Sequence, residues 1–322
     1  DQPGFRQGPG VGWIDHDGDG WEDLVVGAGA DGNAGVFLSR DRGARFERVE
    51  VSRPAGGDQL AVVALPGAKG GQEIWMAESN LEAPPGTPSR IVRHARGTAP
   101  VEIPAGLAPV GSLAAADVDG DGDLDLFVGA RSRAGRYPEP SPSTLWIRDG
   151  ETLRPDPARS GPFQNLGPVQ GAVWDDVDGD GDPDLVLTEE WGNVRLFLND
   201  QGRFTDRSTD WGLGERTGLW SGVTTGDFDG DGRPDLAVGN RGRNTAYGLL
   251  PSQTIRLHFG QWTTNGPVAL VEGYLESGQE YPIADRLRLA RGLPDLPTRF
   301  PTHAAFGAAS IEQILGPHRD RM

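Results

Sequence analysis

The chain of 322 residues contains 49 glycines, 26 prolines and no cysteine, and it has a formal net charge of −17. The charge argues against nucleic acid and anionic membrane surfaces as partners, because like charges repel and no basic stripe is present. The lack of cysteine excludes disulfides, thiolate chemistry and iron–sulfur clusters. The sequence has no run of about 18 apolar residues, so we expect no membrane-spanning helix.

The first recognisable element is an acidic loop followed by an apolar run. Residues 15–23 read Asp-His-Asp-Gly-Asp-Gly-Trp-Glu-Asp and precede the run 24–26, which is Leu-Val-Val. Three more loops of the same pattern begin at Asp117, Asp176 and Asp227. We name these nine-residue segments loop A (15–23), loop B (117–125), loop C (176–184) and loop D (227–235), and number their positions 1 to 9. Recurrent short apolar runs between Gly/Pro turns predict strands rather than disorder.

The spacing of the loops predicts a repeat hidden between loops A and B. The gap from Asp15 to Asp117 is about twice the gap from Asp176 to Asp227. Residues 72–77 repeat the strand pattern of 22–27, but the preceding loop 65–71 has no carboxylate and carries Lys69 where loop A has Asp19. We interpret it as a degenerate loop, with replacement of an ion by the ammonium group as the alternative. A sixth, weaker copy spans 260–270, and we expect calcium at neither.

The strand patterns around each loop predict blades of a propeller. Loop C shows the full unit, with strands expected at 171–174, 185–188, 194–198 and 203–204. Four strands in about fifty residues are typical of propeller blades. We predict an all-β protein, a β-propeller of six four-stranded blades over residues 1–280, or of seven if the two ends of the chain combine into one more.

The remaining residues, 281–322, predict a short C-terminal helical segment. Helical patterns cover 283–293 and 302–315, with Thr302 as a candidate N-cap and Gly316 as a stop signal. We expect this segment to pack on the last blade, with a docking element for a partner as the alternative.

The acidic loops have the composition of calcium sites. Calcium takes six to eight oxygen ligands at about 2.3–2.6 Å. Carboxylates at positions 1, 3, 5 and 9 can converge if glycines at positions 4 and 6 adopt positive φ, and the carbonyl of position 7 would add a further oxygen. We therefore expect about four Ca²⁺ ions. The predicted ligand residues are Asp15, Asp17, Asp19, Trp21 and Asp23; Asp117, Asp119, Asp121, Asp123 and Asp125; Asp176, Asp178, Asp180, Asp182 and Asp184; and Asp227, Asp229, Asp231, Arg233 and Asp235.

A magnesium site, a zinc site or an EF-hand would fit the loops less well than the calcium site described above. Magnesium prefers near-ideal octahedra that keep several waters, and zinc sites usually contain cysteine or clustered histidine. An EF-hand requires Glu at position 12 between two helices. That position is apolar in all four loops and lies in a strand pattern: Val26, Val128, Leu187 and Val238. Solvated acidic turns would not account for four copies with one spacing.

The repeated units resemble FG-GAP/VCBS repeats, the family that includes the calcium-bearing blades of integrin α-subunits. Residues 227–236 carry the resemblance most closely, and residues 281–316 are similar to the helical insert of bacterial VCBS proteins of the cartilage-acidic-protein type. The resemblance implies a propeller with calcium loops between the strands of a blade and a role in adhesion or assembly. It implies no particular ligand. The degenerate loop 65–71, the weak copy at 260–270 and the lack of a complete last repeat depart from the family pattern.

Motifs typical of enzymes fail in this chain. Residues 27–32 match G-x-G-x-x-G, but no helix pattern follows, as a dinucleotide site requires. No G-x-S-x-G or H-E-x-x-H motif occurs. Trp13 and Trp174 each lie two residues before the first Asp of a loop. We interpret them as packing between blades, with a carbohydrate-stacking platform as the alternative.

Together these patterns favour a non-catalytic calcium-binding propeller that acts as an interaction, adhesion or scaffold module. We expect a protein partner, possible membership of a larger envelope complex, and a glycan as a further candidate. We expect a secreted, cell-surface or periplasmic location, because weak calcium sites fill at about 10⁻⁴–10⁻³ M outside cells, and a mature chain from which a signal peptide has been removed. The alternative is a secreted polysaccharide lyase or hydrolase whose site lies in the propeller channel, where two facing carboxylates would be needed.

Overall fold

The computed structural model describes residues 8–50, 54–67, 71–81, 83–84, 86–242, 246–250, 254–263, 266, 268–316 and 318. The chain divides into two compact units. Unit 1 comprises Asp1–Ala134 and Glu139–Asn240, and unit 2 comprises Gly135–Pro138 and Arg241–Met322. The division after Asn240 falls earlier in the chain than the boundary expected at residue 280. None of the helices in the described part of the chain has the length and apolarity needed to cross a membrane.

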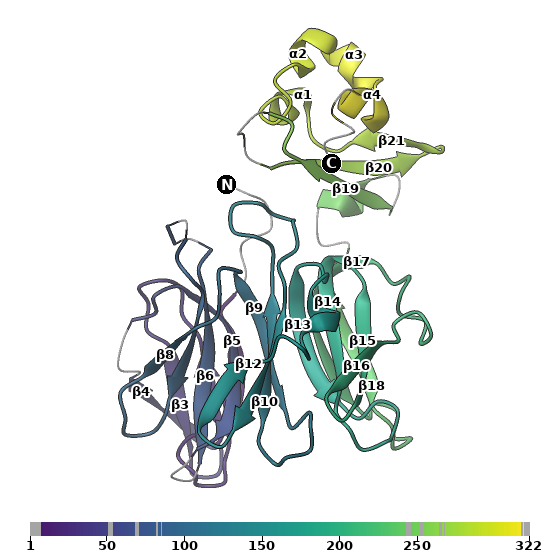
Figure 1. Ribbon diagram of the computed structural model, residues 1–322. Helices are drawn as coiled ribbons and strands as arrows, with labels where there is room; N and C mark the ends of the chain where they lie inside the picture. Colours follow the sequence, from purple (N-terminus) through teal and green to yellow (C-terminus); the bar gives the residue numbers. More distant parts are fainter. Residues whose placement is uncertain are drawn as a thin grey trace. The chain divides into compact units, whose positions relative to one another are not determined.

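Among the described residues, unit 1 contains three antiparallel sheets of four strands and one of six strands (Figure 1). We treat the six-stranded sheet as two parts, a four-stranded sheet 4 and a two-stranded sheet 5. Sheet 1 contains β1 (Val11–Ile14), β2 (Asp23–Val26), β3 (Gly35–Arg40) and β4 (Arg45–Glu50). Sheet 2 contains β5 (Asp58–Pro66), β6 (Gln72–Ser79), β7 (Arg90–His94) and β8 (Val101–Pro104). Sheet 3 contains β9 (Val110–Ala116), β10 (Asp125–Ala130), β11 (Thr144–Asp149) and β12 (Thr152–Pro155). Sheet 4 contains β13 (Val169–Asp175), β14 (Asp184–Gly192), β15 (Val194–Asp200) and β16 (Arg203–Asp206), and sheet 5 contains β17 (Gly218–Gly226) and β18 (Asp235–Asn240).

The five sheets succeed one another in the manner of propeller blades. The first strand of each sheet contacts the first strand of the next, in the order β1, β5, β9, β13 and β17. The end of β14 also pairs with β17, so sheets 4 and 5 are joined by hydrogen bonds. The prediction of an all-β fold built from four-stranded propeller sheets is thus confirmed. The number of blades, six or seven, is not confirmed: sheet 5 has two strands in the described part of the chain.

In its described residues, unit 2 holds a three-stranded sheet and four short helices. Its sheet contains β19 (Ile255–Gly260), β20 (Ala269–Glu276) and β21 (Gln279–Pro282). Its helices are α1 (Arg286–Leu289), α2 (Leu296–Arg299), α3 (His303–Gly307) and α4 (Ile311–Leu315), and short 3₁₀ turns lie at Gly161–Phe163 in unit 1 and Ala246–Leu249 in unit 2. The weak sixth repeat at 260–270 therefore forms the β19–β20 connection.

The prediction of two longer helices is wrong in its bounds. Thr302 caps α3 as expected, since its Oγ1 accepts a hydrogen bond from the Ala305 N–H at 3.1 Å, and Gly316 ends α4. The expected helix 302–315 is interrupted because Ser310 caps a new helix with a reciprocal capping box to Gln313. The helices share one apolar core with β20 and Trp262, which includes Leu293, Leu296 and Ile314.

A recurring aromatic pair shows how successive sheets of unit 1 pack. In sheet 4 the Trp174 and Phe204 rings lie 5.7 Å apart, and they also contact Phe127 and Phe163, which belong to sheet 3 and the segment after it. In sheet 1 the equivalent rings of Trp13 and Phe46 lie 6.1 Å apart, but Trp13 is 54% exposed. The packing interpretation thus holds for Trp174, whereas Trp13 lies on an exposed face.

This difference predicts unequal effects of two matched substitutions. Trp174→Ala should destabilise unit 1 by about 3 kcal/mol, because it empties space between two sheets. Trp13→Ala should cost less than about 1 kcal/mol, because most of the ring already faces solvent. Urea unfolding followed by circular dichroism would measure both. Equal losses for the two variants would contradict the exposed position of Trp13.

Candidate metal centres

All four acidic loops join the first strand of a sheet to the second. Loop A connects β1 to β2, loop B connects β9 to β10, loop C connects β13 to β14, and loop D connects β17 to β18. Position 9 of each loop is the first residue of the second strand and pairs with the residue just before position 1: Ile14 with Asp23, Ala116 with Asp125, Asp175 with Asp184, and Gly226 with Asp235. The strand register therefore brings positions 1 and 9 together.

The glycines at positions 4 and 6 adopt the predicted backbone conformation. All eight have positive φ, between 74° and 97°. This region is strained for residues with a Cβ. The glycines are Gly18, Gly20, Gly120, Gly122, Gly179, Gly181, Gly230 and Gly232. The turn that the spacing predicted is thus confirmed in each loop.

The Asp at position 1 organises the turn by accepting backbone hydrogen bonds. In loop B, Asp117 Oδ1 accepts from the Gly120 N–H at 2.8 Å, and its Oδ2 accepts from the Gly122 N–H at 2.9 Å. The same two bonds form in the other three loops with Asp15, Asp176 and Asp227. Backbone N–H groups thereby fix the carboxylate before any ion is considered.

The Asp at position 9 ties the loop to the next strand. Asp125 is fully buried, accepts from the Val118 N–H at 3.1 Å, and accepts from the Arg148 N–H on β11 at 2.9 Å. Asp23 and Asp184 do the same with Ser39 on β3 and Asn199 on β15. Burial raises the pKa of both Asp125 and Asp184 to about 6.

Three carboxylates converge in each loop. Their oxygens lie within 4.8 Å of one another in four clusters: Asp15, Asp17 and Asp19; Asp117, Asp119 and Asp125; Asp176, Asp178 and Asp184; and Asp227, Asp229 and Asp235. The structure thus assembles twelve of the sixteen aspartates predicted as side-chain ligands.

The other four aspartates predicted as ligands lie outside these clusters. Position 5 joins the cluster in loop A alone. In all four loops its Oδ1 accepts the N–H of position 7, as in Asp19 with Trp21 and Asp121 with Asp123, and the same bond forms in loops C and D. Asp23, at position 9 of loop A, lies outside its own cluster while making the strand tether described above.

The aspartates at position 7 of loops B and C have a role that the sequence did not indicate. Asp123 Oδ2 accepts from the Gly150 N–H at 2.7 Å, and Asp182 Oδ2 accepts from the Gln201 N–H at 2.9 Å. These side chains hold the turn between the third and fourth strands of their sheets. Coordination by the position 7 carbonyls, including those of Trp21 and Arg233, stays a prediction.

The clusters fit an oxygen-preferring divalent cation. Asp17 Oδ1 and Asp119 Oδ1 are buried and have no hydrogen-bond partner among the described residues. A buried carboxylate oxygen without a partner is costly, and a cation between the converging carboxylates would satisfy it. Every candidate ligand is a hard oxygen donor, which suits calcium or magnesium rather than zinc.

Two family comparisons match segments that contain loops B, C and D. Residues 176–238, with loops C and D, match an FG-GAP-like repeat, and residues 110–136, with loop B, match an FG-GAP repeat. The chain contains FG-GAP repeats at these two segments. Loop A lies outside the two matched segments, although its hydrogen-bond pattern at position 1 equals that of the matched loops.

Solved structures of similar fold are distant. BBS1N in complex with ARL6DN is 13% identical, with a TM-score of 0.46 over 85% of this chain and 78% of that chain. Two rhamnogalacturonan lyases, PL11 from Bacillus licheniformis and YesW, are 13% and 15% identical, with TM-scores of 0.41 and 0.42. Each of these two matches covers 86% of this chain and 57% of the lyase. The chain therefore spans a little over half the length of each lyase. No curated protein matches the chain significantly in sequence.

The degenerate repeat positions differ from the FG-GAP loops. Lys69 lies outside the described residues, but the adjoining Gln72 contacts loop A: its Oε1 accepts from the Asp15 N–H at 3.0 Å, and its own N–H donates to the Asp15 carbonyl at 3.0 Å. In the copy at 260–270, Gln261 Nε2 donates to the Gly266 carbonyl at 2.8 Å. Among the described residues of both segments, no cluster of three metal-ligating side chains occurs.

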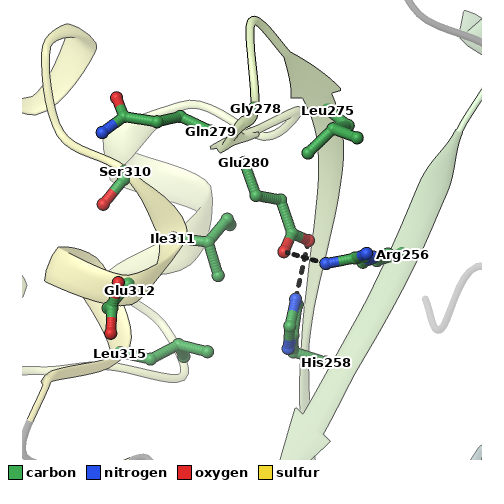
Figure 2. A pocket seen from close by; sticks show the side chains of 10 residues that line it. All are labelled: Arg256, His258, Leu275, Gly278, Gln279, Glu280, Ser310, Ile311, Glu312 and Leu315. Carbon is green, nitrogen blue, oxygen red and sulfur yellow. Dashed lines mark hydrogen bonds and ion pairs between the residues drawn. The ribbon is translucent and has the colours of Figure 1, made fainter.

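Unit 2 contains a pocket of about 360 Å³ between its sheet and α4 (Figure 2). Glu280 Oε1 lies 2.7 Å from His258 Nε2, and its Oε2 lies 3.7 Å from Arg256 Nη1. Ile311 and Leu315 supply an apolar wall. The Glu280 carboxylate is thus already paired with two basic groups.

Proposed function

We propose that this FG-GAP repeat protein is a calcium-stiffened interaction module, with one Ca²⁺ in each of loops A to D. The observation that carries the proposal is a cluster of three aspartates on the same glycine turn, between the first and second strands of four sheets. Calcium is favoured over magnesium because the loops supply several carboxylates at once, whereas magnesium keeps most of its waters.

In this proposal the ions act on the stiffness of one edge of unit 1. Loop A contacts the β5–β6 connection through Gln72, and loop B contacts sheet 4, where Asn199 Nδ2 donates to the Val118 carbonyl at 2.9 Å. Neighbouring loops and turns therefore form a connected edge. A bound cation neutralises converging carboxylates that otherwise repel, so the edge becomes a fixed surface for a partner.

The partner that we propose is a protein outside the cytoplasm, where calcium is high enough to fill weak sites. Membership of an envelope complex and glycan binding are finer forms of the same proposal. We propose no catalytic role. The alternative of a polysaccharide lyase or hydrolase would require two facing carboxylates without a metal between them. The groups of three carboxylates that converge among the described residues are those of the loops, and they support metal binding instead.

Metal analysis tests the proposal directly. Equilibrium dialysis of the protein against excess calcium should give about four bound Ca²⁺ per chain by plasma emission spectroscopy. Asp119→Ala and Asp178→Ala should each reduce the count by one, because each removes a carboxylate from one cluster. Asp210→Ala is the matched control, since this Asp pairs with Arg207 at the surface and belongs to none of the four clusters. Zero or one ion in the wild type would reject the proposal.

Partner binding and catalysis are separated by a second measurement. Capture of a protein from an envelope extract should depend on calcium and should fail with the Asp119→Ala and Asp178→Ala chains. Depolymerisation of acidic or neutral polysaccharides by the purified chain, at a rate unaffected by these substitutions, would instead favour the enzyme alternative.

A further inference from the structure

The four loops differ in one respect that their repeated sequence does not show. In loop A, Arg40 Nη1 lies 2.6 Å from Asp17 Oδ2. In loop B, Arg159 Nη2 lies 3.2 Å from Asp119 Oδ2. In both loops the arginine binds one oxygen of the position 3 carboxylate, and the other oxygen, Oδ1, is the buried atom without a hydrogen-bond partner.

The arginines reach the loops from different places in their sheets. Arg40 is the last residue of β3, whereas Arg159 follows β12. Each is held by a second carboxylate as well: Arg40 Nε lies 3.1 Å from Glu47 Oε2, and Arg159 Nη1 lies 2.9 Å from Asp156 Oδ2. The two contacts are therefore not one inherited feature of the repeat, and both guanidinium groups are fixed in position.

Loops C and D have no such contact among the described residues. The position 3 carboxylates bond to their own loop instead, where Asp178 Oδ1 accepts from the Asp180 N–H at 3.2 Å and Asp229 Oδ1 accepts from the Asp231 N–H at 3.1 Å. These two aspartates still join their clusters. An arginine is thus not needed to bring a position 3 carboxylate into place, and its main effect must come from its charge.

We infer that Arg40 and Arg159 act as built-in counter-cations that lower the calcium affinity of loops A and B, so that the four sites fill in two steps. The inference rests on the proposed function. A fixed positive charge beside the cluster relieves carboxylate repulsion in the metal-free loop and repels the incoming divalent ion. Loops C and D, without this charge, fill first, and loops A and B remain folded when calcium is low.

The proposal predicts effects of opposite sign on affinity and on metal-free stability. Arg40→Gln should tighten calcium binding at loop A by on the order of tenfold, from Coulomb's law for one unit charge beside a divalent ion in a water-like dielectric. The same substitution should lower the melting temperature in chelator, because carboxylate repulsion is then uncompensated. Arg159→Gln should do the same for loop B, and each variant tests its own loop independently.

Calorimetric calcium titration at low ionic strength, with melting curves in chelator, tests this inference. The wild type should show two tight and two weak sites, and the Arg40→Gln/Arg159→Gln chain should show four similar sites. Arg45→Gln is the matched control, because Arg45 forms a pair of intermediate length with Asp41, 2.7 Å, outside the loops. It should leave both the titration and the melting curve unchanged.

Three results would overturn the inference. Weaker calcium binding by the arginine variants would make the arginines positioning groups, and four equal sites in the wild type would remove the two-step filling. If the calcium affinities shifted no more than in Arg45→Gln, the arginine contacts would be ordinary surface ion pairs without an effect on calcium binding. Failure of the proposed function is distinguishable, because the wild type would then bind no calcium in the same titration.

Discussion

A calcium chelator should lower the melting temperature of unit 1 by more than ten degrees. A ligand that binds the folded state alone stabilises it by about 2.7 kcal/mol per site at a hundredfold excess over its dissociation constant. Two filled loops would thus add about 5 kcal/mol. For domains of about 150–250 residues this corresponds to roughly 10–20 °C. The clusters of loops A to D all lie in unit 1, so their effects accumulate there.

Scanning calorimetry with and without excess chelator measures this shift. Chelator presaturated with calcium is the control for the additive itself, and magnesium at the same concentration tests the choice of ion. Magnesium should restore only a small part of the stability, because it resists the loss of its waters. Superimposable curves with and without chelator would mean that the loops do not depend on metal for their folded state.

The features that were predictable from the sequence are local ones. The glycine turns, the loop positions between first and second strands, and the strands of sheet 4 follow from spacing within nine to fifty residues. Gly120 and Gly122 illustrate this, since their positive φ was implied by the close succession of Asp117, Asp119 and Asp121. Backbone sterics over such short distances leave few alternatives.

The features that were not predictable depend on contacts between distant segments. The sequence treats the aspartates of a loop as equivalent, but the strand tethers draw Asp125 and Asp184 into buried positions beside β11 and β15. The arginine contacts of loops A and B arise from chain segments that carry no motif. The blade number was uncertain for a related reason, because the repeat at 260–270 forms a hairpin but is followed by the helices of unit 2.

The position 9 aspartates should differ sharply in their effect on stability. Asp125 is fully buried and holds the N–H groups of Val118 and Arg148, whereas Asp235 is partly exposed and accepts from the Phe228 N–H at 3.0 Å within its own loop. Asp125→Ala leaves two buried donors unsatisfied, each costing about 1–3 kcal/mol. We expect a loss of about 3–5 kcal/mol for Asp125→Ala and about 1 kcal/mol for Asp235→Ala.

Urea unfolding in chelator isolates this difference from the metal, because neither variant then carries an ion. In the presence of calcium the two variants should instead behave alike. Metal analysis should show one Ca²⁺ lost from each, since both aspartates belong to a cluster. Equal calcium loss with unequal stability would separate the two roles of position 9, which is a cluster member in loops B, C and D and a strand tether in loops A, B and C. If the two variants lost equal stability in chelator, the tether to β11 would carry no net energy, and position 9 would act through the metal alone.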